Sequence, residues 1–161
     1  MKPRVYVETS VLSYLTSWPS GDLVAAGRQK ITRDWWRLAQ GAFELTVSEL
    51  VQREAGEGDP QAARDRQEAT KGLRVLAVDE RVRRVARALL AGKAVPPSEA
   101  EDALHIALAV VNGVEYLVTW NLKHIANALM RSKIERACIA EGYNPCIICT
   151  PEELMEFESN V

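Results

Sequence analysis

The stretch "VYVETSVLSYL" (residues 5–15) joins a short apolar run to a segment that begins like a helix. Residues 5–7 are β-branched or aromatic, which is typical of a buried strand, and residues 9–10 are Thr and Ser, which commonly start helices. Glu8 lies between the two. An acid there has an ordinary structural interpretation, because a carboxylate near the first turn of a helix is stabilised by the helix dipole. A functional role for Glu8 requires partners at the same place.

The rest of the chain alternates between strand-like and helix-like segments. Further strands are predicted at residues 43–47, 73–78, 115–119 and 146–150. Helices are predicted at residues 22–39, 48–56, 59–70, 79–92, 98–113, 125–142 and 150–157. This alternation forms βαβ units, so the sequence predicts a three-layer α/β/α fold with a central, mostly parallel sheet of four to five strands. The length of 161 residues is typical of a single domain spanning residues 1–161.

Local patterns also predict how some helices are placed. The helix at residues 22–39 carries an apolar face that we expect to be buried, formed by Leu23, Gly27, Ile31, Trp35 and Leu38. Capping boxes are predicted at Ser98–Glu101 and Thr150–Glu153, and Glu49 is assigned as the capping partner of Thr46.

The overall composition is that of an ordinary globular protein, with 47% hydrophobic and 26% charged residues. A formal net charge of −2 gives no general attraction to nucleic acid or membranes, so any polyanion must bind through a local basic patch. No apolar run approaches the roughly 20 residues that span a bilayer, and the N-terminus lacks the apolar core of a signal peptide. We therefore expect a cytoplasmic protein without membrane contact.

The chain has three cysteines, Cys138, Cys146 and Cys149. Residues 146–149 have CxxC spacing, but there is no second cysteine or histidine pair to complete a zinc site. The motif also lies inside a predicted strand rather than at a helix start. We expect buried, unpaired thiols.

Three polar residues match Glu8 in their position relative to the predicted sheet. Glu54 lies on the helix after the second strand, Asp102 in the first turn of the helix before the fourth strand, and Asn121 just after that strand. Ligands of open α/β sheets bind outside the carboxyl ends of the strands, so these positions favour a functional role. Taken alone, Glu54 fits a solvated helix position at least as well.

Asp102 is the most informative of these residues. Residues 103–111 are apolar nearly all round, which indicates a buried helix, and Glu101 is already assigned to its cap. An acid at the mouth of a buried helix is costly unless it is paired or bound to a cation. His105, one turn on, is expected to satisfy a hydrogen bond rather than bind metal, and His124 is open to either interpretation.

Carboxylates gathered at one sheet edge repel one another and raise their own pKa values unless a cation neutralises them. Hard oxygen ligands of this kind suit Mg²⁺ or Mn²⁺. Such a cluster serves the metal-assisted hydrolysis of phosphodiesters.

The segments "YVETSVLSYL" (6–15), "VSELVQREAG" (47–56) and "EDALHIALAVVNGVEYLVTWNLKHIAN" (101–127) together resemble the PIN-domain family, which includes VapC-type toxin ribonucleases. The resemblance implies a metal-binding acidic pocket formed by Glu8, Glu54 and Asp102, with Asn121 at the fourth position. Two residues depart from the family pattern. Glu8 replaces the usual Asp, and Asn121 replaces the usual fourth acid, which removes one charge and makes a second metal ion less favourable.

The resemblance implies a Mg²⁺- or Mn²⁺-dependent endoribonuclease that cleaves single-stranded RNA. It also implies a homodimer and a role as the toxin of a type II pair, silenced by a small antitoxin. An alternative is an inactive PIN domain that binds nucleic acid without cleaving it. A flavodoxin-like phosphate or nucleotide binder is a third class, but no glycine-rich loop follows the first strand.

A nuclease needs a basic approach to its acidic site. Candidates are Arg28, Lys30, Arg33, Arg37, Lys123, His124, Arg131, Lys133, Arg136 and the segment 81–87. Trp18 and Trp120 are candidates for base stacking, although core packing is the commoner role of such residues. Thr9, Ser10 and Thr119 are candidates for hydroxyl contacts, with turn and cap roles as the alternative.

Overall fold

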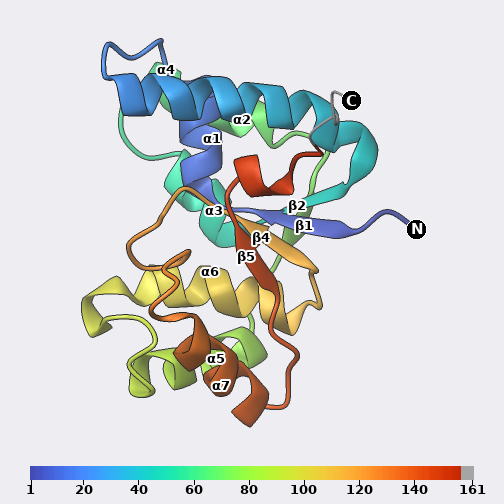
Figure 1. The fold of residues 1–161 in the computed structure, drawn as a ribbon, viewed down its shortest axis with the longest axis vertical. Coiled ribbons are helices and arrows are strands. Elements are labelled where there is room, and N and C mark those ends of the chain that lie inside the picture. The colour runs from blue at the N-terminus through green and yellow to red at the C-terminus, as the bar shows by residue number, and fades with distance from the viewer. Residues whose placement is uncertain (157–161) are drawn as a thin grey trace, which may run out of the picture.

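A computed structural model describes residues 1–156, in which a parallel sheet of five strands forms the middle layer (Figure 1). The strands are β1 (Arg4–Val7), β2 (Glu44–Ser48), β3 (Arg74–Leu76), β4 (Tyr116–Val118) and β5 (Ile147–Cys149). They are arranged in the order β3-β2-β1-β4-β5, and each pairing is parallel. The predicted parallel sheet is confirmed.

Helices cover both faces of this sheet (Figure 1). They are α1 (Thr9–Thr16), α2 (Leu23–Ala42), α3 (Glu49–Ala55), α4 (Pro60–Ala69), α5 (Glu80–Ala91), α6 (Ala100–Val111) and α7 (Arg131–Ala140), with 3-10 turns η1 (Pro97–Glu99) and η2 (Glu152–Leu154). α1 packs against α2, α3 and α4 in one layer, and α5 packs against α6 and α7 in the other. The predicted three-layer α/β/α fold is confirmed. Among the described residues, no helix combines the length and apolar character that crossing a bilayer requires.

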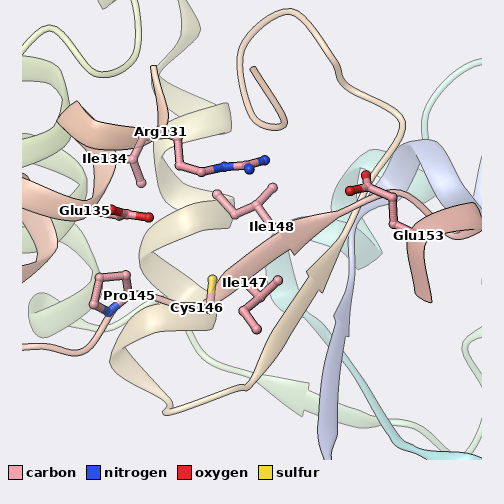
Figure 2. A pocket seen from close by; sticks show the side chains of 8 residues that line it. All are labelled: Arg131, Ile134, Glu135, Pro145, Cys146, Ile147, Ile148 and Glu153. Carbon is pink, nitrogen blue, oxygen red and sulfur yellow. The ribbon is translucent and has the colours of Figure 1, made fainter. Parts of the chain in front are cut away.

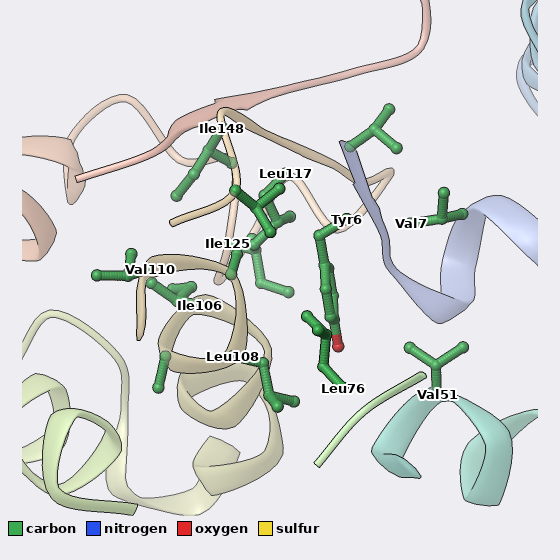
Figure 3. Close-up of a cluster of buried hydrophobic side chains, with 14 of the residues drawn as sticks. Tyr6, Val7, Val51, Leu76, Ile106, Leu108, Val110, Leu117, Ile125 and Ile148 are labelled. Atoms are coloured by element: carbon green, nitrogen blue, oxygen red, sulfur yellow. The ribbon is translucent and has the colours of Figure 1, made fainter. Parts of the chain in front are cut away.

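β1 is central because its residues are apolar on both faces. Val5 and Val7 have no exposed surface, and neither has Tyr6 between them. Side chains alternate along a strand, so Val7 points away from α6 while the Tyr6 ring points towards α6 and Leu76 (Figure 3). Burial on both faces is typical of a parallel strand between two helical layers.

The connections place a switch point beside β1. The chain builds β2 and β3 on one side of β1 and then returns to build β4 and β5 on the other side. Loops that leave the carboxyl ends of β1 and β4 therefore diverge to opposite layers, and ligands of open α/β sheets bind at such a point.

The buried face of α2 differs from the predicted one. Leu23 and Leu38 are 89% and 58% exposed, and Gly27 is also exposed. The face that packs inward is formed by Gln29, Thr32, Trp35 and Ala39. The prediction is confirmed for Trp35, which is fully buried, and for Ile31, which packs against the core, but it is wrong for Leu23, Gly27 and Leu38. Two of the buried positions are instead polar residues whose hydrogen bonds are satisfied internally. Gln29 Nε2 donates to the Trp18 carbonyl (2.8 Å), and Thr32 Oγ1 accepts from Trp120 Nε1 (2.8 Å).

Two predicted caps are also wrong, and one is confirmed. α6 begins at Ala100 after η1 and has no side-chain cap, so Ser98 and Glu101 form no capping box. Ser48, not Thr46, caps α3, and Glu49 instead accepts a hydrogen bond from the Val78 amide. Thr150 and Glu153 do form the predicted reciprocal pair, but it opens the short turn η2 rather than a helix. The end of this predicted helix, residue 157, lies outside the described residues.

The predicted helix at residues 125–142 is shorter in the structure. Only Arg131–Ala140 is helical, and turns occupy the residues before it. Asn127 explains the late start, because its side-chain oxygen accepts from the Leu129 amide (2.9 Å) and so competes with helical hydrogen bonding.

Alanine substitutions on α2 test which face is buried. We expect Trp35→Ala to lower the free energy of unfolding by about 3 to 5 kcal/mol, because Trp35 has no exposed surface. Leu38→Ala, three residues on, should change it by no more than about 0.5 kcal/mol. Urea unfolding measures both values, and a larger loss for Leu38→Ala would contradict the orientation of α2.

Candidate functional site at the carboxyl edge of the sheet

The four residues predicted as a site lie on four different elements that end or begin at the carboxyl edge of the sheet. Glu8 follows β1, Glu54 lies on α3 directly after β2, Asp102 lies in the first turn of α6, and Asn121 follows β4. A series of hydrogen bonds connects these elements. The parallel strands thus bring distant parts of the sequence to one place.

Glu8 is a buried acid held by neutral donors. It is 5% exposed and caps α1, since its carboxylate accepts from the Ser10 amide (2.7 Å). Its other oxygen accepts from Ser10 Oγ (2.7 Å) and from Thr119 Oγ1 (2.5 Å). These hydrogen bonds use three of the roughly four acceptor positions of a carboxylate. Glu8 therefore has both a cap role and room for one further contact.

Glu54 is joined to the start of α1 and to α6. Its Oε1 accepts from Thr9 Oγ1 (2.6 Å) and pairs with Nε2 of the buried His105 (2.7 Å). Burial raises the pKa of Glu54, but the hydrogen bond and charge of His105, together with the Thr9 and Glu101 contacts, outweigh burial and lower the pKa to about 2. Glu54 is therefore ionised at neutral pH, and its Oε2 is not used by these two contacts.

His105 lies at the centre of a buried chain of polar groups. Burial lowers the pKa of His105, but its hydrogen bond to Glu54 and the charges of Glu8, Glu54 and Asp102 raise it overall. Its Nδ1 is 2.7 Å from the hydroxyl of Tyr6, which is 2.8 Å from Ser48 Oγ. The expectation that His105 satisfies a hydrogen bond is confirmed, and its partners come from β1 and α3 rather than from its own helix.

Asp102 is a half-buried acid next to His124 and Asn121. Its Oδ2 lies 3.1 Å from His124 Nδ1, and the Asn121 side-chain oxygen accepts from the His124 amide (3.0 Å). Burial raises the pKa of Asp102, and the negative charge of Glu8 adds to the rise, although hydrogen bonding to Asn121 and the charges of His105 and His124 oppose it. Burial, the largest of these effects, therefore keeps the pKa of Asp102 above its ordinary value.

Lysine and arginine do not neutralise these acids. Among the ion pairs within residues 1–156, none joins Glu8, Glu54 or Asp102 to a lysine or arginine. Arg53 pairs instead with Glu101 (2.8 Å). The pKa of Glu101 is raised, first by its hydrogen bond with Glu54. Crowded, unneutralised carboxylates of this kind favour the binding of a cation.

One group of described residues has metal-ligand spacing, and it only partly matches the predicted set. Glu99, Asp102 and His124 each place a ligand atom within 4.8 Å of the others. Glu8 and Glu54 lie outside this group. Mg²⁺ commonly uses one or two carboxylates directly and completes its shell with water and substrate phosphate. The carboxylates at this edge therefore fit a Mg²⁺ or Mn²⁺ ion even if Glu8, Glu54 and Asp102 do not all contact it.

A model of the PIN domain matches residues 5–128 of the chain. The chain belongs to the PIN domain family. PIN domains are in general metal-dependent nucleases, which agrees with an edge that gathers acids rather than a glycine-rich loop. A comparison with curated proteins found no significantly similar sequence.

Two residues beside the acids of this PIN domain were missed or left open by the sequence. Glu99 was not singled out, because η1 had been read as part of a capped helix. His124 was left open between a hydrogen bond and a metal ligand. Their spacing could have indicated both residues as neighbours of the site, since Glu99 is three residues before Asp102 and His124 is three residues after Asn121.

A hollow of the PIN domain lies along the edge strand β5, and none of the predicted site residues lines it (Figure 2). It has a volume of about 340 Å³ and is lined mainly by apolar side chains, with Arg131, Glu135 and Glu153 at its rim. Cys146 faces it, and burial raises the pKa of this thiol to about 12. All three cysteines are unpaired, and Cys138 and Cys149 are buried, as predicted, whereas Cys146 is partly exposed.

Replacing His105 tests the buried chain of polar groups. We expect His105→Leu to lower the free energy of unfolding by about 3 kcal/mol, because it leaves Glu54 and the Tyr6 hydroxyl without their partner. Urea unfolding at pH 7 measures the change. Tyr6→Phe is the matched control, since it keeps the His105–Glu54 pair and should cost only about 1 to 2 kcal/mol. A smaller cost for His105→Leu than for Tyr6→Phe would contradict the central place of His105.

Proposed function

We propose that this PIN domain is an endoribonuclease that hydrolyses phosphodiester bonds of single-stranded RNA with Mg²⁺ or Mn²⁺. The observation that carries the proposal is the gathering of Glu8, Glu54 and Asp102 at the carboxyl edge of the sheet without neutralisation by lysine or arginine in the described residues. Membership of the PIN family supports the nuclease chemistry. The choice of RNA rests on the resemblance of residues 6–15, 47–56 and 101–127 to VapC-type ribonucleases.

In this proposal Asp102 holds the ion with help from Glu8 and Glu54. Asp102 is suited to direct contact because it is the one of these three acids that lies at metal-ligand spacing with Glu99 and His124. Glu8 and Glu54 are each fixed through hydrogen bonds and keep an acceptor position for the ion or for its water. A bound divalent cation supplies charge neutralisation and polarises the phosphodiester.

Asn121 shapes the site rather than adding charge to it. Its side-chain oxygen accepts from the His124 amide, and its hydrogen bond with Asp102 opposes the rise of the Asp102 pKa. His124 Nδ1 lies against the same acid. In this proposal Asn121 and His124 orient Asp102, and the missing fourth acid favours one ion over two.

Cleavage of single-stranded RNA tests the proposed activity. We expect the protein to cleave an RNA oligonucleotide with Mg²⁺ or Mn²⁺, EDTA to abolish cleavage, and Asp102→Asn to lower the rate at least about 100-fold, since even partners that only orient metal ligands cost 10- to 100-fold. Gel analysis of the products measures the rate. Glu44→Gln is the control, because Glu44 lies at the opposite edge of the sheet and should leave the rate unchanged.

The same assay separates an active nuclease from a binding module. Binding of RNA without cleavage, together with cleavage gained by Asn121→Asp, would establish that the fourth position has lost an acid needed for activity. Failure to bind or cleave RNA under all of these conditions would contradict the proposed function.

We further propose that the protein acts as a homodimer and as the toxin of a type II toxin–antitoxin pair. Both parts of this proposal rest on the resemblance to VapC-type proteins. We expect expression of the wild-type chain in a bacterial host to arrest growth, because RNA is degraded, and expression of Asp102→Asn at equal protein level to permit growth. Growth curves with immunoblots measure this. Equal growth with both chains would contradict the toxin role.

A further inference from the structure

α2 carries four basic residues, Arg28, Lys30, Arg33 and Arg37, and two of them pair with a carboxylate of the same helix. Lys30 and Arg37 both pair with Asp34 and are committed to a local ion pair. Arg28 has no carboxylate partner within residues 1–156, and its guanidinium lies instead against two aromatic rings. Arg33 Nη2 donates to the Ser17 carbonyl. Arg28 is therefore a cation with its charge still available for a ligand.

The aromatic contacts hold Arg28 in place. Its guanidinium carbon is 5.3 Å from the centre of the Trp120 ring and 5.9 Å from that of Tyr14, and Nη1 is 3.3 Å from the Tyr14 hydroxyl. The two rings themselves meet edge to face at 6.0 Å. Stacked guanidinium groups keep most of their five N–H donors free at the rim, and their fixed orientation reduces the entropy lost when a ligand binds.

Hydrogen bonds connect Trp120, one of the two rings that Arg28 contacts, to the acidic edge. The Trp120 amide donates to Ser10 Oγ (2.8 Å), which in turn donates to Glu8 (2.7 Å). Trp120 also lies between Thr119 and Asn121, and Tyr14 is one turn after Ser10 on α1. The Trp120 indole is held against α2, because its Nε1 donates to Thr32, which lies on that helix as Arg28 does. Arg28 thus stacks on a tryptophan whose backbone is hydrogen-bonded into the Glu8 network, and within residues 1–156 it is not paired with a carboxylate.

A guanidinium in this position suits a phosphate. The carboxylates repel an RNA strand, so a substrate needs a fixed cation close to them. Arginine binds phosphate through paired N–H donors, which a stacked guanidinium presents at its edge. We propose that Arg28, held by Tyr14 and Trp120, contacts a backbone phosphate of the single-stranded RNA next to the scissile bond. This inference rests on the proposed function and names one of the groups that bind its substrate.

Binding measured apart from cleavage tests this inference. The probe is a fluorescently labelled single-stranded RNA oligonucleotide, and anisotropy is recorded with Mg²⁺ over a range of salt concentrations in the Asp102→Asn background. We expect Arg28→Gln to raise the Kd about tenfold, since a charge-assisted hydrogen bond is lost. The slope of log K against log salt should also fall by about 0.7, the value for one contact to a single strand.

Two further variants distinguish a phosphate contact from a structural effect. Arg28→Lys keeps the charge but loses the planar stack, so the salt slope should stay unchanged while the Kd rises less than with Arg28→Gln. Arg37→Gln removes an arginine of the same helix that already pairs with Asp34, and it should change neither quantity. Thermal unfolding of each variant checks that the fold is kept.

The outcomes separate this inference from the proposed function. An unchanged Kd and slope for Arg28→Gln, equal effects of Arg28→Gln and Arg37→Gln, or no RNA binding by the Asp102→Asn protein would each overturn the role of Arg28. RNA cleavage by the wild type together with an unchanged Arg28→Gln would leave the nuclease proposal standing. Binding that depends on Arg28 without cleavage by the wild type would support the contact and contradict the nuclease.

Discussion

The parallel pairing of β1 with both β2 and β4 is the constraint on which the rest of the structure depends. It sets the carboxyl ends of the central strands side by side, so that Thr119 after β4 reaches Glu8 after β1. It also sends α1 and α6 to opposite layers from that edge. Each polar group of the candidate site is placed by an element that begins or ends there. The site therefore depends on strand register, because a slip by one residue would turn Glu8 to the other face.

The acids are tolerated at this edge because most of their hydrogen bonds come from neutral donors and from histidine. Hydroxyl groups of Thr9, Ser10 and Thr119 meet Glu54 and Glu8, and His105 compensates Glu54 from inside the core. These contacts orient the carboxylates without cancelling their charge as a tight arginine pair would. Burial, with a smaller contribution from the charge of Glu8, raises the pKa of Asp102, and a divalent cation beside this acid would favour its ionised form.

Prediction from sequence succeeded where neighbouring residues specify the structure and failed where the partner is distant. The five strands and their parallel pairing follow from the alternation of short apolar runs with helices. The inward face of α2 does not, because Gln29 and Thr32 are buried through bonds to residues 18 and 120, which hydrophobic periodicity cannot register. Glu101 likewise pairs with Arg53, a contact 48 residues away along the chain, rather than with its local cap.

The sequence by itself determined the order of elements, the family, and four polar candidate residues, two after strands and two on helices, since these depend on local propensity and on spacing along the chain. Only the tertiary structure decided that Asp102 lies at metal-ligand spacing with Glu99 and His124, and that His105 joins β1, α3 and α6. It also decided that Arg28 lacks a carboxylate partner in the described residues while Lys30 and Arg37 have one. The physical reason is that hydrogen bonds and charge interactions depend on how close two groups lie in space, not on their separation along the sequence. Residues far apart in sequence set the charge and orientation of each group.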